Sequence, residues 1–241
     1  YRAEASKGSL KIWLTVGGAG RSGGFRAFSK SQTGRDLFAS NLVQLCKREG
    51  LNGADIDWQD ISNESEYEDF LKLLLSASKA LHKEGMLISV TTRQRLPSHV
   101  LEEVDRAQFM GYDLLIGGGP KHHASYSVVT QMIEQWIDWG FPEEKIILGI
   151  PGYARHKDAA SQIKTVAELL DDGLKDDALE EWKGYLFDSP KLIRKKMKFV
   201  KQNNLGGAVL WELGHDKQFK DHPGGWLLHA MSGKRIAKEE L

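Results

Sequence analysis

The sequence is poor in several features that mark common classes of protein. Cys46 is the only cysteine among 241 residues, which excludes an intrachain disulfide framework and a cysteine-based metal site. Lysine and arginine (33) balance aspartate and glutamate (33), and a net charge of zero argues against a nucleic-acid partner and against attraction to a membrane surface. No apolar run is long enough to span a bilayer. The remaining composition, 41% hydrophobic and 27% charged, is that of an ordinary globular protein.

Strand-like and helix-like patterns alternate along the chain, without an internal repeat or a low-complexity tract. β-Branched and aromatic runs predict six β-strands, over residues 11–16, 52–57, 86–91, 108–113, 145–150 and 206–212. Apolar spacing and capping residues predict helices over residues 36–50, 63–81, 100–104, 125–139 and 189–204. Asn63 and Glu66 are spaced as a capping box, and the segment 157–188 is polar and helix-prone. The alternation is typical of βα units that build a parallel sheet.

One predicted strand, residues 52–57, carries an acidic face. Asp55, Asp57 and Gln59 occupy alternate positions and therefore point to one side, whereas the residues between them are apolar. In a closed barrel of parallel strands this side is the interior, which rises towards the mouth where the strands end. Crowded carboxyl groups shift each other's pKa values, so a row of acids at a barrel mouth is typical of an active site. Acids of a surface loop are the alternative, and the alternation along a strand argues against it.

The residues from Asn52 to Gln59 read Asn-Gly-Ala-Asp-Ile-Asp-Trp-Gln. They resemble the signature D-G-x-D-x-D-W-E of the family 18 glycoside hydrolases, the chitinases and their relatives. Two positions depart from the signature. Asn52 replaces an aspartate, and Gln59 replaces the glutamate that serves the family as general acid.

Further segments resemble strands of the same family. The first predicted strand ends in a form of its S-x-G-G element, residues 110–113 match its M-x-Y-D, and residues 151–155 and 206–212 resemble the ends of its seventh and eighth strands. The resemblance implies that seven further residues lie at a substrate site: Gly17, Gly18, Met110, Tyr112, Asp113, Tyr153 and Trp211. It implies that Tyr112 hydrogen-bonds the acetamido group of the sugar, that Asp113 contacts sugar hydroxyls, and that Trp211 forms an apolar floor. Ordinary core packing is the alternative for the two aromatic residues.

The implied fold is a (β/α)₈ barrel in one domain, residues 1–241, and the six predicted strands correspond to the third to eighth strands of the family. The first two βα units have no counterpart before Lys11. A barrel without two adjacent strands exposes two sheet edges. We therefore expect either residues upstream of Tyr1 or a protein partner to complete the barrel.

The resemblance also implies a mechanism without metal or cofactor. The acetamido oxygen of the sugar acts as nucleophile, so the protein supplies one acid. Asp57 orients the acetamido group and Asp55 tunes Asp57. A carboxamide at residue 59 donates a hydrogen bond but cannot surrender a proton, and loss of general acid catalysis costs about 10²–10⁴-fold in rate.

Three function classes therefore stay open. The first is a chitinase-like protein that binds chitin or N-acetylglucosamine oligosaccharides without turnover. The second is an endo-chitinase whose glutamate was replaced deliberately by Gln59, and the third is a structural protein whose barrel is an assembly surface. His122 and His123 suggest a metal ligand, but adjacent histidines in a glycine loop without nearby acids are more often solvated.

Two features point to the secretory pathway. Asn63-Glu64-Ser65 is a glycosylation sequon. The chain ends in Lys238-Glu239-Glu240-Leu241, which is close to the K-D-E-L address for the endoplasmic reticulum. A charged chain end without a targeting role is the alternative. The expected location is the endoplasmic-reticulum lumen or the extracellular space.

Overall fold

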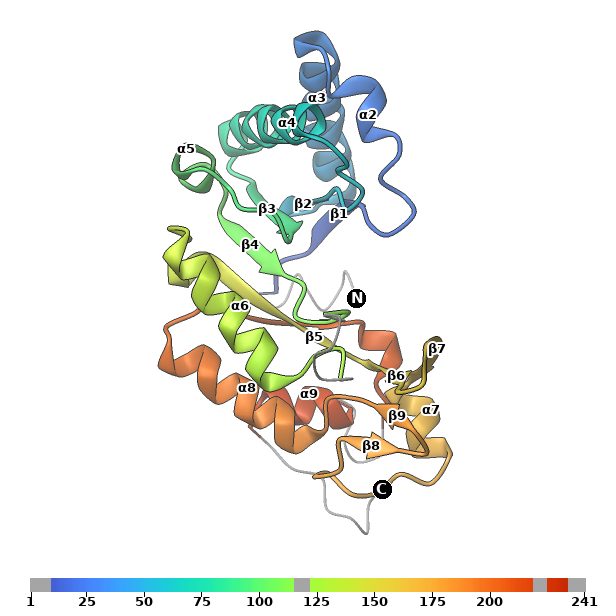
Figure 1. Cartoon of the computed structure of the whole chain (residues 1–241). Helices are drawn as coiled ribbons and strands as arrows, with labels where there is room; N and C mark the ends of the chain where they lie inside the picture. The colour runs from blue at the N-terminus through green and yellow to red at the C-terminus, as the bar shows by residue number, and fades with distance from the viewer. Residues whose placement is uncertain (1–9, 115–121, 219–224, 234–241) are drawn as a thin grey trace. The chain divides into compact units, whose positions relative to one another are not determined.

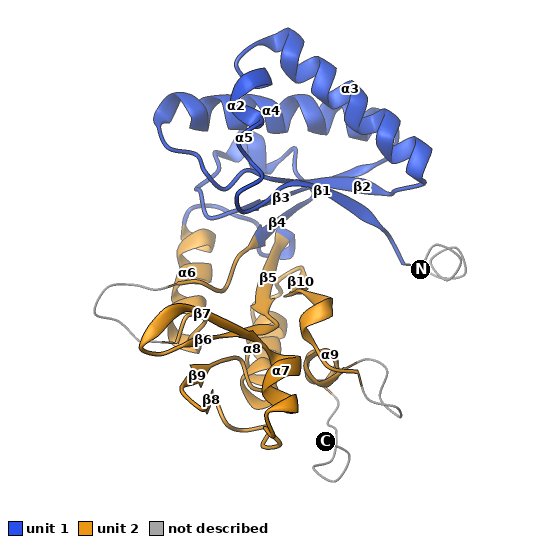
Figure 2. Cartoon of the chain, turned by 90° about the vertical axis from the view of Figure 1, so that its right-hand side faces the viewer, with its two compact units in different colours: residues 1–108, 139–145 blue, residues 109–138, 146–241 orange. Residues whose placement is uncertain are grey.

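The structure is a computed structural model that describes residues 10–114, 122–218 and 225–233. A six-stranded sheet has the strand order β1-β2-β3-β4-β5-β10, and a four-stranded sheet has the order β7-β6-β9-β8. The chain divides into two compact units, coloured separately in Figure 2. Unit 1 comprises residues 1–108 and 139–145, and unit 2 comprises residues 109–138 and 146–241.

Unit 1 contains the parallel strands that carry the acidic face. The strands are β1 (Trp13–Gly17), β2 (Gly53–Asp57), β3 (Leu87–Thr92) and β4 (Arg106–Phe109), of which the last residue already belongs to unit 2. Strands β1, β2 and β3 pair in parallel, with Thr15 opposite Asp55 and Asp55 opposite Ser89. These three polar residues therefore form one row across the sheet, on one face.

The helices of unit 1 cover the other face of these strands (Figure 1). They are α2 (Phe25–Phe28), α3 (Gln32–Glu49), α4 (Glu64–Lys83) and α5 (Ser98–Leu101). Trp58 stacks on Phe25 with ring centroids 5.1 Å apart and meets Phe70 of α4 edge-on at 6.2 Å. Ile56 has the parity of Trp58 along the strand and is fully buried. The apolar parity of β2 therefore faces the helices, and the acidic parity faces away from them.

Local signals set the ends of the two long helices. Ser31 caps α3 by accepting a hydrogen bond from the Gly34 amide, so this helix begins four residues before the predicted start at residue 36. Gly50 ends α3 in the left-handed conformation. Asn63 caps α4 through the Glu66 amide (3.0 Å), as predicted. The second bond of the predicted capping box, from the Asn63 amide to the Glu66 carboxylate, is wrong. The Glu66 carboxylate instead accepts hydrogen bonds from Ser62 and Arg26.

Unit 2 holds the parallel pair β5 (Ile146–Pro151) and β10 (Gly207–Trp211), with Trp211 opposite Pro151. Its longer helices are α6 (Tyr126–Asp138) and α8 (Pro190–Gln202), and α9 (Trp226–Met231) is shorter. The structure also contains the 3₁₀ turns Glu143–Lys145, in unit 1, and Leu213–His215, in unit 2. The six strands of the larger sheet match the six predicted strands. Strand β4 ends earlier than predicted, at Phe109, so Met110, Tyr112 and Asp113 lie in the segment that follows it.

The helix-prone prediction for residues 157–188 is wrong. This part of unit 2 forms an antiparallel sheet from β6 (Tyr153–His156), β7 (Ala159–Thr165), β8 (Glu181–Trp182) and β9 (Tyr185–Leu186), with one short helix, α7 (Val166–Asp171). Trp182, which we expected in a helix, lies in β8. Polar composition did not reveal the sheet because its strands are short and half exposed, so they lack a clear apolar alternation.

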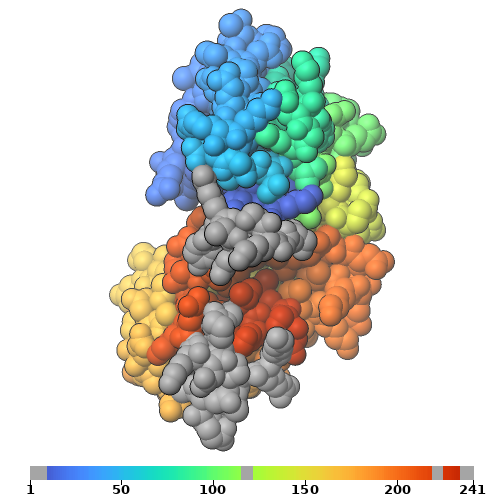
Figure 3. Space-filling view, turned by 180° about the vertical axis from the view of Figure 1, so that it is seen from behind, coloured from blue at the N-terminus to red at the C-terminus, as the bar shows by residue number. Residues whose placement is uncertain are grey.

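The space-filling view in Figure 3 shows residues of unit 1, from blue to green, as one continuous packed surface. Below that surface the core is aromatic and aliphatic, and it includes Trp58, Phe70 and Leu73, each at most 2% exposed. Unit 2 has a separate core in which Phe109 meets Trp136 edge-on at 5.0 Å. This core also contains a charge, because Lys196 of α8 is fully buried against Asp188.

Candidate functional site

Asp55 lies at the centre of a buried hydrogen-bond network in unit 1. Its Oδ1 atom accepts from the Ser89 hydroxyl (2.6 Å) and the Gln108 carboxamide (3.1 Å), and its Oδ2 atom accepts from the Thr91 hydroxyl (2.9 Å). The side chain is 2% exposed. Burial raises the pKa of Asp55, although bonds from Ser89, Thr91, Gln108 and Thr15 partly oppose the shift. Asp55 is therefore fixed in position by its neighbours.

Asp57 stands at the end of β2, one position along the same face. Burial raises its pKa to about 6, and the charge of Asp55 adds to the rise, whereas the bond from Gln59 and the charge of Arg93 oppose it. The Gln59 carboxamide donates to Asp57 Oδ2 at 3.0 Å. The Oδ1 atom of Asp57 is buried and has no hydrogen-bond partner in the part of the chain that the structure describes. Asp57 therefore offers a buried acceptor atom and a carboxyl group that titrates near neutral pH.

Gly17 and Gly18 end β1 beside Asp57. A Cβ atom on Gly17 would lie 2.1 Å from the Asp57 carbonyl oxygen, and both glycines have positive φ angles, of 106° and 99°. The Gly18 amide donates to that same carbonyl oxygen at 2.7 Å. Gly17 is required both for space and for backbone conformation, whereas Gly18 is required for its backbone conformation alone. The two glycines thus let β1 approach the end of β2 closely.

Ser22 joins these glycines to residue 59. Its hydroxyl lies 2.9 Å from the Gly18 carbonyl oxygen and 3.1 Å from that of Asp57, and it accepts from the Gln59 amide at 3.3 Å. The side chain is buried. Sequence reasoning missed Ser22, because only the folded loop brings it to β2.

Asp113 forms a second charged cluster, in unit 2. Its Oδ1 atom lies 2.5 Å from Arg155 Nε and 3.2 Å from His123 Nδ1. Burial alone would raise the pKa of Asp113, but the bonds with His123 and Arg155 outweigh it and place that pKa well below its ordinary value. Asp113 is therefore ionised throughout the neutral range. Its φ of 57° turns the chain sharply behind Tyr112.

Tyr112 and Tyr153 lie next to this cluster. Their rings meet edge-on with centroids 6.0 Å apart, and the Arg155 guanidinium lies 5.7 Å from the Tyr153 ring centroid. Burial and then the negative charge of Asp113 raise the pKa of Tyr153. Gly149 makes room for Tyr112, since a Cβ atom there would lie 3.0 Å from the Tyr112 ring. Unit 2 therefore brings together three of the predicted site residues, Tyr112, Asp113 and Tyr153.

The remaining two predicted residues of unit 2 differ in exposure. Met110 is 7% exposed and belongs to the core. Trp211, at the end of β10, is 49% exposed, so a packing role does not account for its ring. The peptide bond from Trp211 to Glu212 is cis.

The prediction that His122 and His123 are solvated is wrong. His123 is fully buried, and the two rings stack with centroids 5.8 Å apart. His122 Nε2 lies 2.9 Å from the Phe187 carbonyl oxygen, and burial lowers the pKa of His122. The acids that contact these rings, Asp113 and Asp188, are distant in sequence, so the local pattern could not reveal them.

Neither a metal centre nor a membrane span is evident in the described part of the chain. The residues described contain no group of three or more histidine, cysteine, aspartate or glutamate side chains arranged to hold a metal ion. They also contain no helix with both the length and the apolar composition that a bilayer span needs. The chain end with Lys238-Glu239-Glu240-Leu241 lies outside the described residues.

Sequence reasoning found Asp55, Asp57 and Gln59 but missed the side chains that hold them. Ser89 and Thr91 alternate along β3 as Asp55 and Asp57 do along β2. This matching parity on neighbouring strands was available as a signal. The glutamine that completes the network, Gln108, lies within the predicted strand 108–113, but its bond to Asp55 joins residues 53 positions apart, which no local pattern reveals.

Curated relatives of the chain include Chitinase 1 and Chitinase-3-like protein 2. Chitinase 1 of Aphanocladium album is 22% identical over an alignment that covers 92% of this chain and 65% of the relative. Chitinase-3-like protein 2 of Homo sapiens is 23% identical, with 86% of this chain and 70% of the relative covered. The chain thus spans about two thirds of the length of these relatives.

Solved structures share the fold. The family 18 chitinase ChiB of Flavobacterium johnsoniae matches with a TM-score of 0.82 at 21% identity, over 96% of this chain and 77% of that one. A class V chitinase of Nicotiana tobaccum, solved as a glutamate-to-glutamine mutant with the ligand NAG4, matches with a TM-score of 0.78 at 18% identity. The match covers 95% of this chain and 82% of that one. The predicted fold class, the (β/α)₈ barrel, is confirmed by these likenesses.

The sequence model described as Glycosyl hydrolases family 18 matches residues 1–216. This match covers most of the chain, including the strand that carries Asp55, Asp57 and Gln59 and the segment from Met110 to Asp113. The chain therefore belongs to glycosyl hydrolase family 18.

Proposed function

We propose that the protein binds chitin or N-acetylglucosamine oligosaccharides and hydrolyses them negligibly. The observation that supports this most directly is the pair at the end of β2. Gln59 donates to Asp57 Oδ2, while Asp57 Oδ1 is buried without a partner among the described residues. Such an acceptor is suited to the N–H of an acetamido group, because a buried polar atom gains most from a new hydrogen bond.

Residue 59 is, in this proposal, the position of the family's general acid. A carboxamide can donate a hydrogen bond to a glycosidic oxygen but cannot deliver a proton. Asp57, with a pKa of about 6, is in the range useful for proton sharing, yet its neighbour at residue 59 is an amide that has no proton to share. A related barrel, the glutamate-to-glutamine mutant of the Nicotiana tobaccum chitinase, was solved in complex with NAG4, which supports binding without this acid.

The remaining sugar contacts are proposed from the family resemblance. Tyr112 hydrogen-bonds the acetamido group, Asp113 and Tyr153 contact sugar hydroxyls, and Trp211 supplies an apolar platform. The exposure of the Trp211 ring supports the last assignment. Met110 is assigned to sugar binding by the resemblance alone, and Gly17 and Gly18 leave space beside Asp57. The proposed location is the secretory pathway or the extracellular space.

The first test compares hydrolysis of a fluorogenic chitotriose by the parent and by Gln59→Glu. We expect no turnover by the parent and a gain of at least about 10²-fold in the variant, because the variant regains a general acid. Gln44→Glu is the matched control, since it makes the same change at an exposed position of α3. Turnover by the parent would contradict the proposal.

Binding separates the two sugar-binding function classes from the structural scaffold. A chitinase-like protein and a disabled chitinase both bind N-acetylglucosamine oligomers, whereas an assembly scaffold need not. Calorimetric titration of the parent with chitotetraose decides this point. Absence of binding, together with an inactive Gln59→Glu variant, would favour the scaffold.

A further inference from the structure

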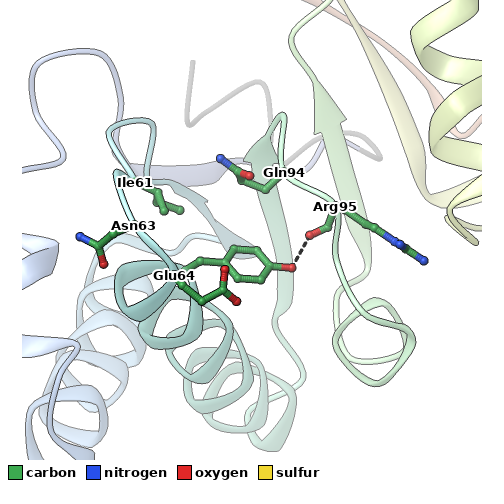
Figure 4. A pocket seen from close by; sticks show the side chains of 6 residues that line it. Ile61, Asn63, Glu64, Gln94 and Arg95 are labelled. Atoms are coloured by element: carbon green, nitrogen blue, oxygen red, sulfur yellow. Dashed lines mark hydrogen bonds between the residues drawn. The ribbon is translucent and has the colours of Figure 1, made fainter.

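Titratable side chains that the proposed function leaves unused occur in both units, and they differ in burial. Unit 1 has a pocket of about 240 Å³, shown in Figure 4, whose lining includes Glu64 and Arg95. Both of these charged residues are exposed, so water can solvate them. Unit 2, in contrast, holds His123, which is fully buried. A buried polar ring needs partners within the protein, and those partners indicate what His123 does.

The Nδ1 atom of His123 contacts both the main chain and the side chain of Asp113. It lies 3.3 Å from the Asp113 amide nitrogen and 3.2 Å from the Oδ1 atom of the same residue. The amide donates when Nδ1 carries a lone pair, and Nδ1 donates to the carboxylate when it carries a proton, so His123 bonds to Asp113 in either form. The other ring nitrogen, Nε2, is buried without a hydrogen-bond partner among the described residues.

Asp113 adopts an arrangement that needs support from its neighbours. Its φ of 57° lies in the left-handed region, which residues with a side chain seldom adopt. Its Oδ1 atom also accepts from Arg155 Nε at 2.5 Å, while the side chain stays 33% exposed. Because one nitrogen of His123 faces both the amide and the carboxylate, this ring restricts the backbone turn and the direction of the carboxylate together.

The segment around His123 is itself fixed, so it can serve as a support. The Leu114 amide donates to the His123 carbonyl oxygen at 2.8 Å, and the buried Lys196 ammonium donates to the next carbonyl oxygen along the chain at 2.6 Å. The imidazole stacks on His122 with ring centroids 5.8 Å apart, and its centroid lies 5.1 Å from that of the Tyr153 ring. These contacts hold the imidazole both through its main chain and through its ring.

From these contacts we propose that His123 is a positioning residue of the carbohydrate site, which holds Asp113 in the conformation that presents its carboxylate to sugar hydroxyls. His123 is inaccessible to solvent and therefore acts through Asp113 rather than on the ligand. The inference rests on the proposed oligosaccharide binding, in which Asp113 contacts hydroxyls. It gives a role to a histidine that the sequence predicted to be solvated.

The first measurement needs no sugar. We expect hydrogen exchange of the Asp113 amide, followed by NMR of the whole protein, to be at least about five-fold faster in His123→Leu, the effect of losing about one hydrogen bond. His123→Asn should exchange much as the parent does, because its carboxamide reaches the position of Nδ1. His122→Leu is the matched control, since it makes the same change at the adjacent ring, which contacts the Phe187 carbonyl oxygen instead.

Thermal unfolding of each variant verifies that it is folded. If His123→Leu does not fold, His123→Gln takes its place, because its carboxamide reaches the position of Nε2 and leaves the position of Nδ1 empty. The comparison of His123→Gln with His123→Asn then tests the same nitrogen.

Calorimetric titration with chitotetraose tests the link to sugar binding. We expect His123→Leu to weaken binding about five-fold and His123→Asn to retain most of the affinity. Because His123 acts through Asp113, the double variant His123→Leu with Asp113→Ala should bind no more weakly than Asp113→Ala alone. His122→Leu should bind as the parent does.

The outcomes separate this role from the proposed function. If the parent binds chitotetraose and His123→Leu changes neither its affinity nor the exchange of the Asp113 amide, the positioning role is wrong and the proposed function stands. Additive losses in the double variant, or an equal loss in His122→Leu, would also overturn the role, since either result indicates a general loss of packing. If the parent binds no sugar, the proposed function fails and the role in sugar binding fails with it. Faster exchange, weaker binding and non-additive losses together support the inference.

Discussion

Two carboxyl groups on alternate positions of β2 have different surroundings. Asp55 accepts hydrogen bonds from side chains of β3 and β4, whereas the side chain that donates to Asp57 is Gln59, two positions along the same segment. Both are nearly inaccessible to solvent, so burial raises both pKa values. Asp55 is therefore held in place by its neighbours, whereas the Oδ1 atom of Asp57 remains available to accept a hydrogen bond.

The raised pKa of Asp57 has a consequence for stability. In the unfolded chain an aspartate titrates near its ordinary pKa of about 3.9, whereas folded Asp57 titrates at about 6. Between these values the folded protein binds more protons than the unfolded chain, so this residue makes the free energy of unfolding fall as pH rises from about 4 to about 6. Above pH 6 its contribution stays constant.

We therefore expect Asp57→Asn to gain stability relative to the parent as pH rises through this window. The measurement is urea unfolding of both proteins at a series of pH values from about 4 to about 8, since the difference between the two isolates this one group. A difference that does not change with pH would contradict the raised pKa. Asp60→Asn, at an exposed position beyond the strand, is the control.

At the scale of elements, helix α8 carries a charge into the core of unit 2. Lys196 is fully buried, and its ammonium group binds Asp188 and the Ala124 carbonyl oxygen (2.6 Å). His122 stands on the other side of Asp188, with Nε2 3.9 Å from Oδ1. The cluster joins α8 to the segments before α6 and before α8. Its partners must all be present, because an unpaired buried charge is costly.

Lys196→Met should therefore destabilise the protein by about 3–5 kcal/mol, since it leaves the Asp188 carboxylate buried without its cation. The free energy of unfolding in urea measures this cost. Lys198→Met, at an exposed position of the same helix, makes the same change and should cost little. A double variant, Lys196→Met with Asp188→Asn, should recover part of the loss. Equal stability of the two lysine variants would contradict the prediction.

Elements whose signals are local were predictable, and those that depend on distant partners were not. The strand 53–57, the cap of α4 at Asn63 and the end of α3 at Gly50 are encoded by neighbouring residues. The burial of His123 depends on Asp113 and Tyr153, which the fold alone brings to it. The antiparallel sheet of β6–β9 depends on pairings between short strands, such as Arg155 with Leu186, that leave little periodic trace.

At the scale of the whole molecule, the alternation of strands and helices predicted a parallel sheet built from βα units, and the family resemblance implied the barrel. The same alternation revealed the acidic face, because position along a strand determines the side to which a residue points. It could not reveal the second sheet, which is formed by the segment between β5 and α8. Loops carry much of the specificity in folds of this class.

Ligand binding should be visible as a stability change of the entire protein. A ligand that binds only the folded state adds about 2.7 kcal/mol to the free energy of unfolding at a concentration of about 100 times its Kd. We expect chitohexaose to raise the melting temperature in proportion to the logarithm of its concentration, and cellohexaose, which lacks acetamido groups, to have a smaller effect. Equal shifts with the two sugars would argue against a site that recognises the acetamido group.

The contact between Gly17 and the end of β2 bears on how such chains are identified in genomes. An exchange at residue 59 alters one side chain and leaves the backbone untouched, whereas any side chain at Gly17 would collide with the Asp57 carbonyl oxygen. The glycine is therefore under a structural demand that does not depend on turnover. A search for members of the family should therefore require the paired glycines and the alternating aspartates and leave residue 59 open, so that sequences with any side chain at this position are found.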